Sequence, residues 1–565
     1  MTTSPWQGQT LRQHPLWPDY LAALQRELKT AMNRFAYDLS CGRAGWPKEL
    51  PMEPAHLLHA WEWLRRRAPA DHWEDILGAS RRPDQAYANQ LLRESATLED
   101  FLSGYLAHWM PRLDDDPRAR EIRAYGTRVA TDAVTPLAQA WRALGRGVLD
   151  PRQALRTLGA AQKARFEAVG GPEDQQRWAL IDRMPDPDSA FSGFDKVALI
   201  PTFACPRGCR HCLLIRPPSL RHAPDPGNLL AGLNRHARSV LFTGGELAGH
   251  QSLFVRAIRE LPRAASLGIL LNGAGVDSVA TAQALFQQLE QARRERPASA
   301  EELDLVIQIS CDEFHQEIIF DPRVGLRERN PLACVAHLLQ AALDFPHLEL
   351  HLLHKQNALN FSSALLHEGV LGRLMRELTT RGLTPRLLSY APTARAKPDP
   401  RNPHLSAHPV RDIALGLGGE GTRPVHLISS TVEAMGRAPL LDPSEWVDER
   451  DYMEQILTRG PPPGECFDIA PMIWLDGTMT LFGAVHYALG NVLTEGWEKV
   501  INRWRKDPLA RALERFDARL PVYYAARGGD WNALLARASG PHHLFHELTA
   551  DAALRLELTK KCIYS

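Results

Sequence analysis

The sequence lacks a long hydrophobic run. No stretch of its 565 residues approaches the roughly 18 consecutive apolar residues of a membrane span, and residues 1–15 lack the apolar segment of a secretory signal peptide. We therefore expect a cytoplasmic protein without a membrane partner.

An excess of charge of either sign is also missing. Lys and Arg together number 66, and so do Asp and Glu. No general basic field therefore attracts nucleic acid or an anionic membrane surface, and we expect no strong nucleic-acid partner.

Cysteine is scarce, with eight residues in the chain. So few cysteines in so long a chain do not indicate the disulfide framework of a small secreted domain. Three of them, Cys205, Cys209 and Cys212, are clustered. This clustering favours a metal-binding loop in a reducing compartment.

The tryptophans divide the chain by composition. Nine of the fourteen lie in residues 1–190, where apolar residues recur at helical spacing, and none occurs between Trp178 and Trp446. A Pro- and Asp-rich stretch at 184–188 follows. We predict a helical N-terminal domain over 1–190.

Short apolar runs alternate with helical stretches from 191 to 400. This alternation predicts an α/β fold with parallel strands, which right-handed crossovers wrap into a barrel or partial barrel. The chemistry is then expected at the carboxyl ends of the strands. The six predicted strands are 197–201, 239–243, 267–272, 303–312, 348–354 and 386–391.

The fourth run shows two faces. Alternation along 303–312 places Cys311 with the apolar residues and Asp312 with the polar ones. We expect Cys311 to be buried under the helices and Asp312 to face the site.

The cysteine spacing is C-x-x-x-C-x-x-C, directly after the first predicted strand. Three thiolates at this spacing can bind three irons of a [4Fe–4S] cube and leave the fourth iron open. A structural zinc site is the alternative, but it needs a fourth ligand, and His211 lies too close to Cys212 to bind the same ion easily. We favour the cluster.

This arrangement resembles the radical S-adenosylmethionine (SAM) enzymes over roughly residues 195–396. The second run ends in a Gly-Gly-Glu segment like the one that contacts the SAM amino group in that family, and the third and fourth runs end in sequences like its T-N-G and S-x-D. The residues that carry the resemblance, beside the three cysteines, are Gly244, Gly245, Glu246, Asn272, Ser310 and Asp312.

The resemblance implies a six-stranded partial (β/α)6 barrel. It also implies a [4Fe–4S] cluster on Cys205, Cys209 and Cys212, with Gly244, Gly245 and Glu246 at the SAM amino group. Asn272, Ser310 and Asp312 are further candidates for contacts with SAM or substrate. The implied reaction is reductive cleavage of SAM to a 5′-deoxyadenosyl radical, with an electron donor such as flavodoxin or ferredoxin as partner.

The sixth strand has two candidates. Residues 386–396 resemble the family's last strand and its P-x-G-R-A sequence with Ala394 in place of the glycine, whereas 435–438 keeps Gly-Arg-Ala after another apolar run. Strand spacing favours the first, so Tyr390 is expected at the end of the sixth strand, where it either faces the substrate or packs in the core.

The C-terminal part, 401–565, resembles the SPASM or twitch extension of peptide-modifying radical SAM enzymes in the layout of Cys466, 473–479 and 489–492. That extension holds auxiliary clusters on further cysteines. Only Cys466 and Cys562 are available here, so we predict a small α+β extension without a full auxiliary cluster site.

Two groups of histidines invite a metal interpretation. They lie at 542–547 and around the fifth predicted strand, at His347, His351 and His354. No ligand from a third element can be identified, so we expect solvated faces.

The sequence therefore predicts a radical SAM enzyme that modifies a peptide or protein side chain. Chemistry on a small metabolite or nucleotide is one alternative. A non-catalytic barrel that binds a partner protein is another, against which the intact cysteines and Gly-Gly-Glu segment argue.

Overall fold

A computed structural model shows two compact units. Unit 1 comprises Met1–Leu158, Ile318–Arg327 and Asp442–Glu445, and unit 2 comprises Gly159–Glu317, Glu328–Leu441 and Trp446–Ser565. The described residues are 9–40, 53–68, 72–78, 83–95, 100, 104, 151–187, 190–213, 227–321, 323–356, 359–360, 367–390, 398–399, 402–406, 413–417, 423–432, 435–441, 445, 449–461, 466–482 and 484–564.

Unit 1 consists mainly of helices around a tryptophan-rich core. Trp61, Leu64 and Ala68 recur at helical spacing and are buried, and the indole N–H of Trp61 donates to the carbonyl of Ser95 at 3.0 Å. The two-stranded β5–β6 hairpin adds Ile318 to the same core. The elements are α1 (Gln9–Arg12), α2 (Trp17–Ser40), α3 (Glu53–Arg67), α4 (Trp73–Leu77), α5 (Pro83–Glu94), β5 (Ile318–Asp321) and β6 (Gly325–Glu328), and α9 (Pro151–Glu167) crosses the division between the units.

Unit 2 contains a large, mostly parallel sheet, which confirms the predicted α/β class. Among the described residues the sheet has eleven strands in the order β16-β15-β14-β1-β2-β3-β4-β7-β13-β12-β9, parallel from β14 to β13. The strands are β1 (Val197–Ile200), β2 (Ser239–Phe242), β3 (Ser266–Leu271), β4 (Asp304–Ser310), β7 (Leu348–Gln356), β9 (Arg386–Tyr390), β12 (Ile413–Leu417), β13 (Arg423–Thr431), β14 (Pro471–Trp474), β15 (Thr478–Leu481) and β16 (Ala484–Asn491).

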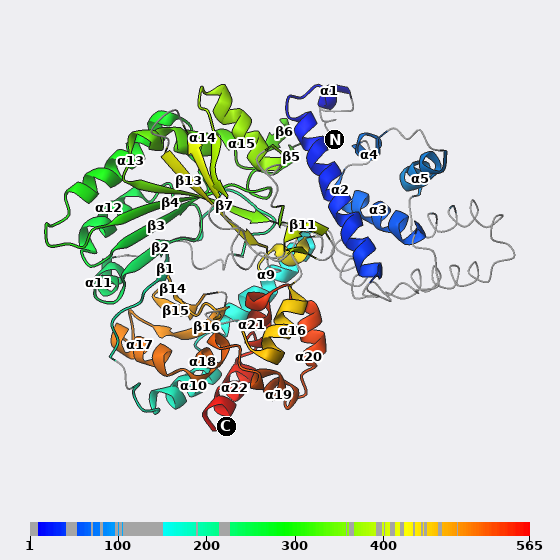
Figure 1. Cartoon of the computed structure of the whole chain (residues 1–565). Coiled ribbons are helices and arrows are strands. Elements are labelled where there is room, and N and C mark those ends of the chain that lie inside the picture. Colours follow the sequence, from blue (N-terminus) through cyan, green and yellow to red (C-terminus); the bar gives the residue numbers. More distant parts are fainter. Residues whose placement is uncertain are drawn as a thin grey trace. The chain divides into compact units, whose positions relative to one another are not determined.

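Helices between the parallel strands lie in a row along the sheet (Figure 1). Their apolar faces and one face of β4, including the fully buried Cys311, belong to the same core, as predicted from the alternation in that strand. The helices are α11 (Gly227–His236), α12 (Gln251–Glu260), α13 (Val279–Arg294), α14 (Leu332–Ala341) with the short η3 (Ala342–Asp344), and α15 (Gly369–Thr380).

The predicted sixth strand does not occupy the sixth parallel position. Residues 386–390 do form a strand, β9, but it pairs antiparallel with β12 near the edge of the sheet. The strand parallel to β7 is β13, with Leu427 opposite Leu352. Gly436 therefore follows the sixth parallel strand, and residues 391–396, the favoured candidate, lie outside the described residues.

The C-terminal part extends the same sheet instead of standing apart from it. Its first strand, β14, pairs parallel with β1, and β15 and β16 follow as an antiparallel meander. The remaining elements are β8 (Leu359–Asn360), β10 (Pro398–Asp399), β11 (Asn402–Ser406), η5 (Ala438–Leu440), α10 (Pro172–Asp182), α16 (Arg450–Arg459), α17 (Trp497–Lys506), α18 (Pro508–Glu514), α19 (Arg519–Ala525), α20 (Trp531–Arg537), α21 (Pro541–Leu548) and α22 (Ala552–Tyr564).

Helix α10 is fixed to this C-terminal part by buried ion pairs. Arg177 contacts Asp507 at 2.6 Å, Arg555 contacts Asp174 at 3.1 Å, and all four side chains are at most 1% exposed. The indole of Trp178 donates to the carbonyl of Ala488. Contacts thus divide the chain near 158, not at the boundaries of 190 and 400 expected from composition.

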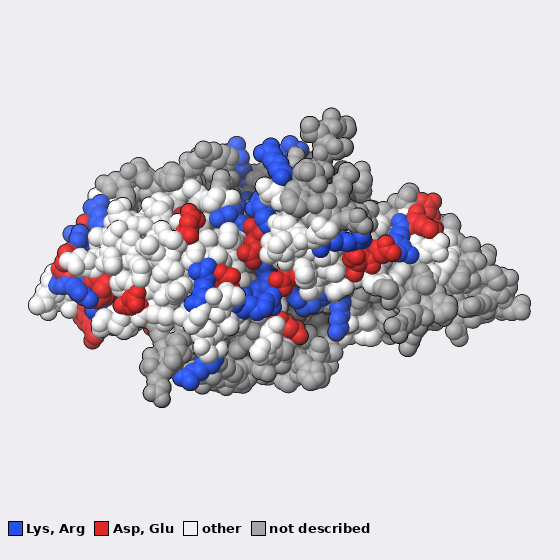
Figure 2. Space-filling view, turned by 90° about the horizontal axis from the view of Figure 1, so that it is seen from above, with Lys and Arg blue, Asp and Glu red and all other residues white. Residues whose placement is uncertain are grey.

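Charge on the described surface is mixed. Lys and Arg side chains lie beside Asp and Glu side chains on the face shown in Figure 2, in keeping with the equal totals in the sequence. Within the described ranges, no helix combines the length and the apolar character that spanning a bilayer requires.

We predict that Arg177→Met lowers the free energy of unfolding by about 3–5 kcal/mol, because the substitution leaves the Asp507 carboxylate buried without its cation. Urea denaturation followed by tryptophan fluorescence measures the change. The control is Arg519→Met, which removes an ion pair to Asp517 from an arginine side chain that is 53% exposed and should cost less than about 1 kcal/mol. Equal losses in the two variants would contradict the prediction.

Candidate functional site

The carboxyl ends of the parallel strands bring the predicted residues to one edge of the sheet. The three cysteines follow β1, the Gly-Gly-Glu segment follows β2, Asn272 follows β3, and Asp312 follows β4. Parallel strands end at the same edge, so loops far apart in the sequence become neighbours here.

The three cysteines lie on a mostly buried loop. Cys209 is buried, and Cys205 and Cys212 are half-buried. Burial raises the pKa of the Cys209 thiol to about 12, and the neighbouring charges of Asp312 and Cys212 add to the shift. Cys209 is therefore a protonated thiol at neutral pH in the metal-free chain.

Gly245 allows two loop backbones to approach closely. Its N–H donates to the carbonyl of Thr202 at 2.8 Å, and the N–H of Glu246 donates to that of Ala204 at 2.8 Å. A Cβ atom on Gly245 would lie 2.2 Å from the Ala204 carbonyl oxygen, and one on Gly244, whose φ is +131°, would lie 2.6 Å from that of Thr202. Glycine is required at both positions because no side chain fits between the loops.

Glu246 connects this contact to the third strand. Its two carboxylate oxygens accept the backbone N–H groups of Ala248 at 2.8 Å and Asn272 at 3.1 Å, and the Asn272 side-chain amide lies 3.5 Å from the sulfur of Cys205. Burial raises the pKa of Glu246, and the backbone hydrogen bonds partly offset this effect. One hydrogen-bonded chain thus joins the residues predicted from three separate motifs.

Two arginines and one glutamate hold the cysteine loop from another side. Arg329 donates to the carbonyl of Gly208 at 3.0 Å and pairs with Glu317 at 2.6 Å, and Glu317 also pairs with Arg210 at 2.8 Å. Arg207 in turn donates to the carbonyl of Arg329. The loop that carries the cysteines is thereby tied to the segment that leads into α14.

The segment after β13 closes against the end of the cysteine loop. The N–H of Arg437 donates to the carbonyl of Cys212 at 2.9 Å. Gly436 has a φ of +62°, and a Cβ atom there would lie 2.3 Å from the Cys212 carbonyl oxygen and 2.5 Å from that of Leu213. The Gly-Arg-Ala sequence that was the second candidate for the sixth strand's end is therefore the one that contacts the cysteines.

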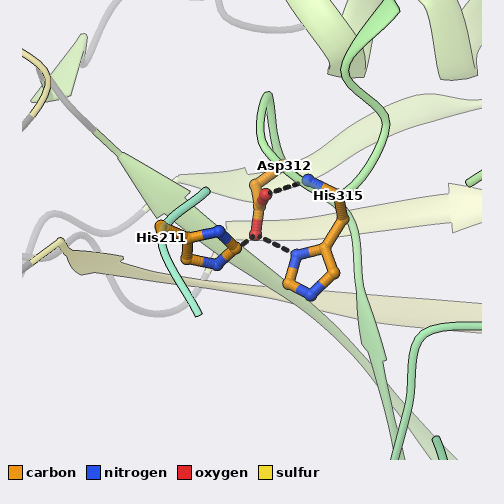
Figure 3. Close-up of side chains that lie close together, drawn as sticks. All are labelled: His211, Asp312 and His315. Atoms are coloured by element: carbon orange, nitrogen blue, oxygen red, sulfur yellow. Dashed lines mark hydrogen bonds and ion pairs between the residues drawn. The ribbon is translucent and has the colours of Figure 1, made fainter. Parts of the chain in front are cut away.

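Asp312 lies between two imidazoles (Figure 3). Its Oδ2 is 2.8 Å from Nδ1 of His315 and 4.0 Å from Nε2 of His211, while its Oδ1 accepts the N–H groups of Phe314 and His315. Burial alone would raise the pKa of Asp312, but the charges of His315 and His211 lower it below its ordinary value. Burial lowers the pKa of His211 to about 3, so its ring is neutral near pH 7.

Other predicted residues do not join the site. Ser310 is buried at the end of β4, and among the described residues no side-chain hydrogen bond links it to the other candidates. Tyr390 ends β9, which β12 separates from β13, so it does not follow the sixth parallel strand. Cys466 is exposed and Cys562 is half-buried.

The histidine groups were expected to be solvated, and this was wrong in part. His543 and His546 on α21 and His354 on β7 are buried. His546 packs edge-on against His486, which is buried on β16. Their environment is tertiary packing, which helical spacing alone does not reveal.

Sequence reasoning missed His315, Arg329 and Glu317 as parts of the site. The histidine had a local signal, because Asp312 and His315 stand three residues apart directly after a predicted strand. The arginine and the glutamate had none, because their partners lie about a hundred residues earlier. Among the described residues, a close group of three potential metal ligands is formed by His211, Asp312 and His315, not by the three thiols.

Comparison with models of known protein families gave no match for this chain, and a search of curated proteins gave none either.

We predict that Gly436→Ala destabilises the cysteine loop more than Gly382→Ala destabilises its own turn. Both glycines have positive φ, +62° and +79°, so both substitutions carry a similar backbone cost of about 1–2 kcal/mol. Only at Gly436 does a Cβ meet backbone atoms, since nothing lies within 4 Å of one at Gly382. Urea denaturation should show an additional loss of about 1–3 kcal/mol for Gly436→Ala, and amide exchange should rise in residues 205–213. Equal behaviour of the two variants would exclude the contact.

Proposed function

We propose that the chain is a radical SAM enzyme. The observation that carries the proposal is the hydrogen-bonded chain from Glu246 through Asn272 to Cys205, together with the backbone contact of Gly245. A set of unrelated cysteines and glycines would have no reason to meet at one edge of a parallel sheet. Their meeting supports a common role for motifs that the sequence presents separately.

The sheet supports the same proposal. Six parallel strands, β1, β2, β3, β4, β7 and β13, stand next to one another in this order. We propose that these six strands form the partial barrel, with β14 as an addition at the first edge. The glycine-containing segment after β13 then takes the place that the family resemblance assigns to the end of the sixth strand.

The donor set fits an iron–sulfur cluster. Three thiols on one loop offer three ligands, and Cys205, Cys209 and Cys212 would hold the cluster. Such a cluster, when bound, supplies the electron for reductive cleavage of SAM. Cys209 has a pKa of about 12 in the metal-free chain, so it must release its proton as it becomes a ligand.

The remaining residues act by position and by exclusion of water. Glu246 presents a carboxylate at the β2 end, where it would accept the SAM ammonium while it keeps Asn272 in place. The ring of Phe203, on the cysteine loop, stacks on Trp474 with centroids 5.2 Å apart and is buried, so the loop rests on an apolar base. A dry, fixed loop suits a reactive intermediate that water or a misplaced substrate would divert.

For the substrate we propose a peptide or protein side chain. The support is the C-terminal meander β14–β15–β16, whose sequence resembles the SPASM or twitch extension and which lies directly beside the cysteine strand β1. An external one-electron donor of the flavodoxin or ferredoxin kind would complete the system.

We predict one cluster per chain. Anaerobic reconstitution should give about four irons and four sulfides in the wild type and none in the variant with Cys205, Cys209 and Cys212 all changed to Ala. The control is Cys311→Ala, which removes a fully buried thiol from the helix-facing core and should leave the iron content unchanged. About eight irons in the wild type, or iron retained in the triple variant, would contradict the assignment.

We predict that Glu246→Ala weakens SAM binding while the cluster's absorbance is kept. A charge-assisted contact contributes roughly 1.5–3 kcal/mol, so affinity should fall about 10- to 150-fold. Glu246→Gln keeps one oxygen acceptor for a backbone N–H and should retain the loop but not the SAM affinity. Calorimetry on the reconstituted proteins measures this, with Glu260→Ala, an exposed carboxylate on α12, as control. Wild-type affinity in Glu246→Ala would refute the role.

A further inference from the structure

A second group of ligands lies beside the cysteine loop. One potential ligand atom from each of His211, Asp312 and His315 lies within 4.8 Å of the others. Figure 3 shows the two rings on either side of the Asp312 carboxylate. His211 comes from the loop after β1, and the other two come from the turn after β4.

The separations are close to those around a single ion. A tetrahedral ion with bonds of about 2.0–2.1 Å holds its ligand atoms roughly 3.3 Å apart. The observed distances from Asp312 Oδ2 are 2.8 Å to His315 Nδ1 and 4.0 Å to His211 Nε2. Movements of less than about 1 Å would therefore bring these atoms to ligand positions.

The His211 ring lacks the hydrogen bonds that a buried imidazole normally makes. Its side chain is 8% exposed, and its Nδ1 atom is buried without a hydrogen-bond partner among the described residues. Stacking on Phe314, with centroids 4.6 Å apart, holds the ring in place without satisfying either nitrogen. A buried polar atom without a partner costs free energy, and a bond from the ring to a metal ion would offset this cost.

Charge and access also suit a cation. Asp312 brings a carboxylate to the group, and the nearby Arg210 is engaged by Glu317 at 2.8 Å. The His315 side chain is 18% exposed, whereas that of Asp312 is 1% exposed. An ion would thus have a path in on the side of His315 and a buried anion behind it.

We propose that His211, Asp312 and His315 form a second metal site, separate from the three cysteines, for one divalent transition-metal ion. Two imidazoles and one carboxylate suit Zn²⁺ or Fe²⁺, whereas Mg²⁺ and Ca²⁺ prefer oxygen ligands throughout. Three protein ligands leave at least one coordination position open for water or a substrate group. The ion lies next to the loop that carries the cysteines, and the proposal holds whether or not that loop binds a cluster.

The test uses the full chain with Cys205, Cys209 and Cys212 changed to Ala, so that no thiol of the loop can bind the probe. Co²⁺ is added anaerobically and followed by its visible d–d absorption and by calorimetry. We expect one Co²⁺ per chain, without the near-ultraviolet charge-transfer band of a cobalt–thiolate bond. In the same background, His315→Gln and Asp312→Asn should each weaken binding at least about 100-fold.

The control is His337→Gln, which removes an imidazole whose Nδ1 contacts the carbonyl oxygen of Val276 and which lies outside the group. It should bind Co²⁺ like its parent. Thermal unfolding with and without Zn²⁺ adds an independent reading, since the ion should raise the midpoint of the parent but not that of His315→Gln. Absence of Co²⁺ binding in the cysteine-free chain, or binding that survives both substitutions, would show that the Asp312–His315 hydrogen bond is only a structural contact.

Discussion

The close approach of two backbone segments is the constraint on which the candidate site depends. The loop after β2 lies against the loop after β1 through two backbone hydrogen bonds, and Gly245 leaves the space in which they form. This contact places Glu246 within reach of the third strand and orients the start of the cysteine loop. Without it, the residues of the site would be distributed over separate strand ends.

The cysteine loop is held from several sides before any ligand binds. Glu317 and Arg329 secure its middle, and the Gly436 segment contacts its end. These partners come from the turn after β4, the segment before α14 and the segment after β13. Fixing a ligand loop in this way reduces the entropy that metal binding has to overcome, and rigid placement is what a reactive site needs.

The N-terminal and C-terminal regions meet in the packing of α10. Arg177 and Trp178 belong to the tryptophan-rich part of the sequence, yet they are buried against β16 and the start of α18. Burial alone would lower the pKa of Arg177, but Tyr487 and Asp507 raise it, so the arginine stays charged. A buried charge that depends on a distant partner makes the two regions one folding unit.

The sequence by itself determined the strands and the main motifs. Local patterns located all six predicted runs as strands, and the alternation along β4 placed Cys311 in the core. The motif residues could be found because parallel strands end at one edge, which is a property of the fold class and needs no knowledge of individual contacts.

Only the tertiary structure decided which strand stands beside β7 and what surrounds the cysteines. Residues 386–390 and β13 are both apolar runs, so local propensity cannot choose between them; the choice rests on pairing across the sheet, where Leu427 meets Leu352. For the same reason the His211–Asp312–His315 group stayed hidden, because one imidazole lies about a hundred residues from the other two ligands. Long-range packing brings such residues together, and its energy is not written in the spacing of any single segment.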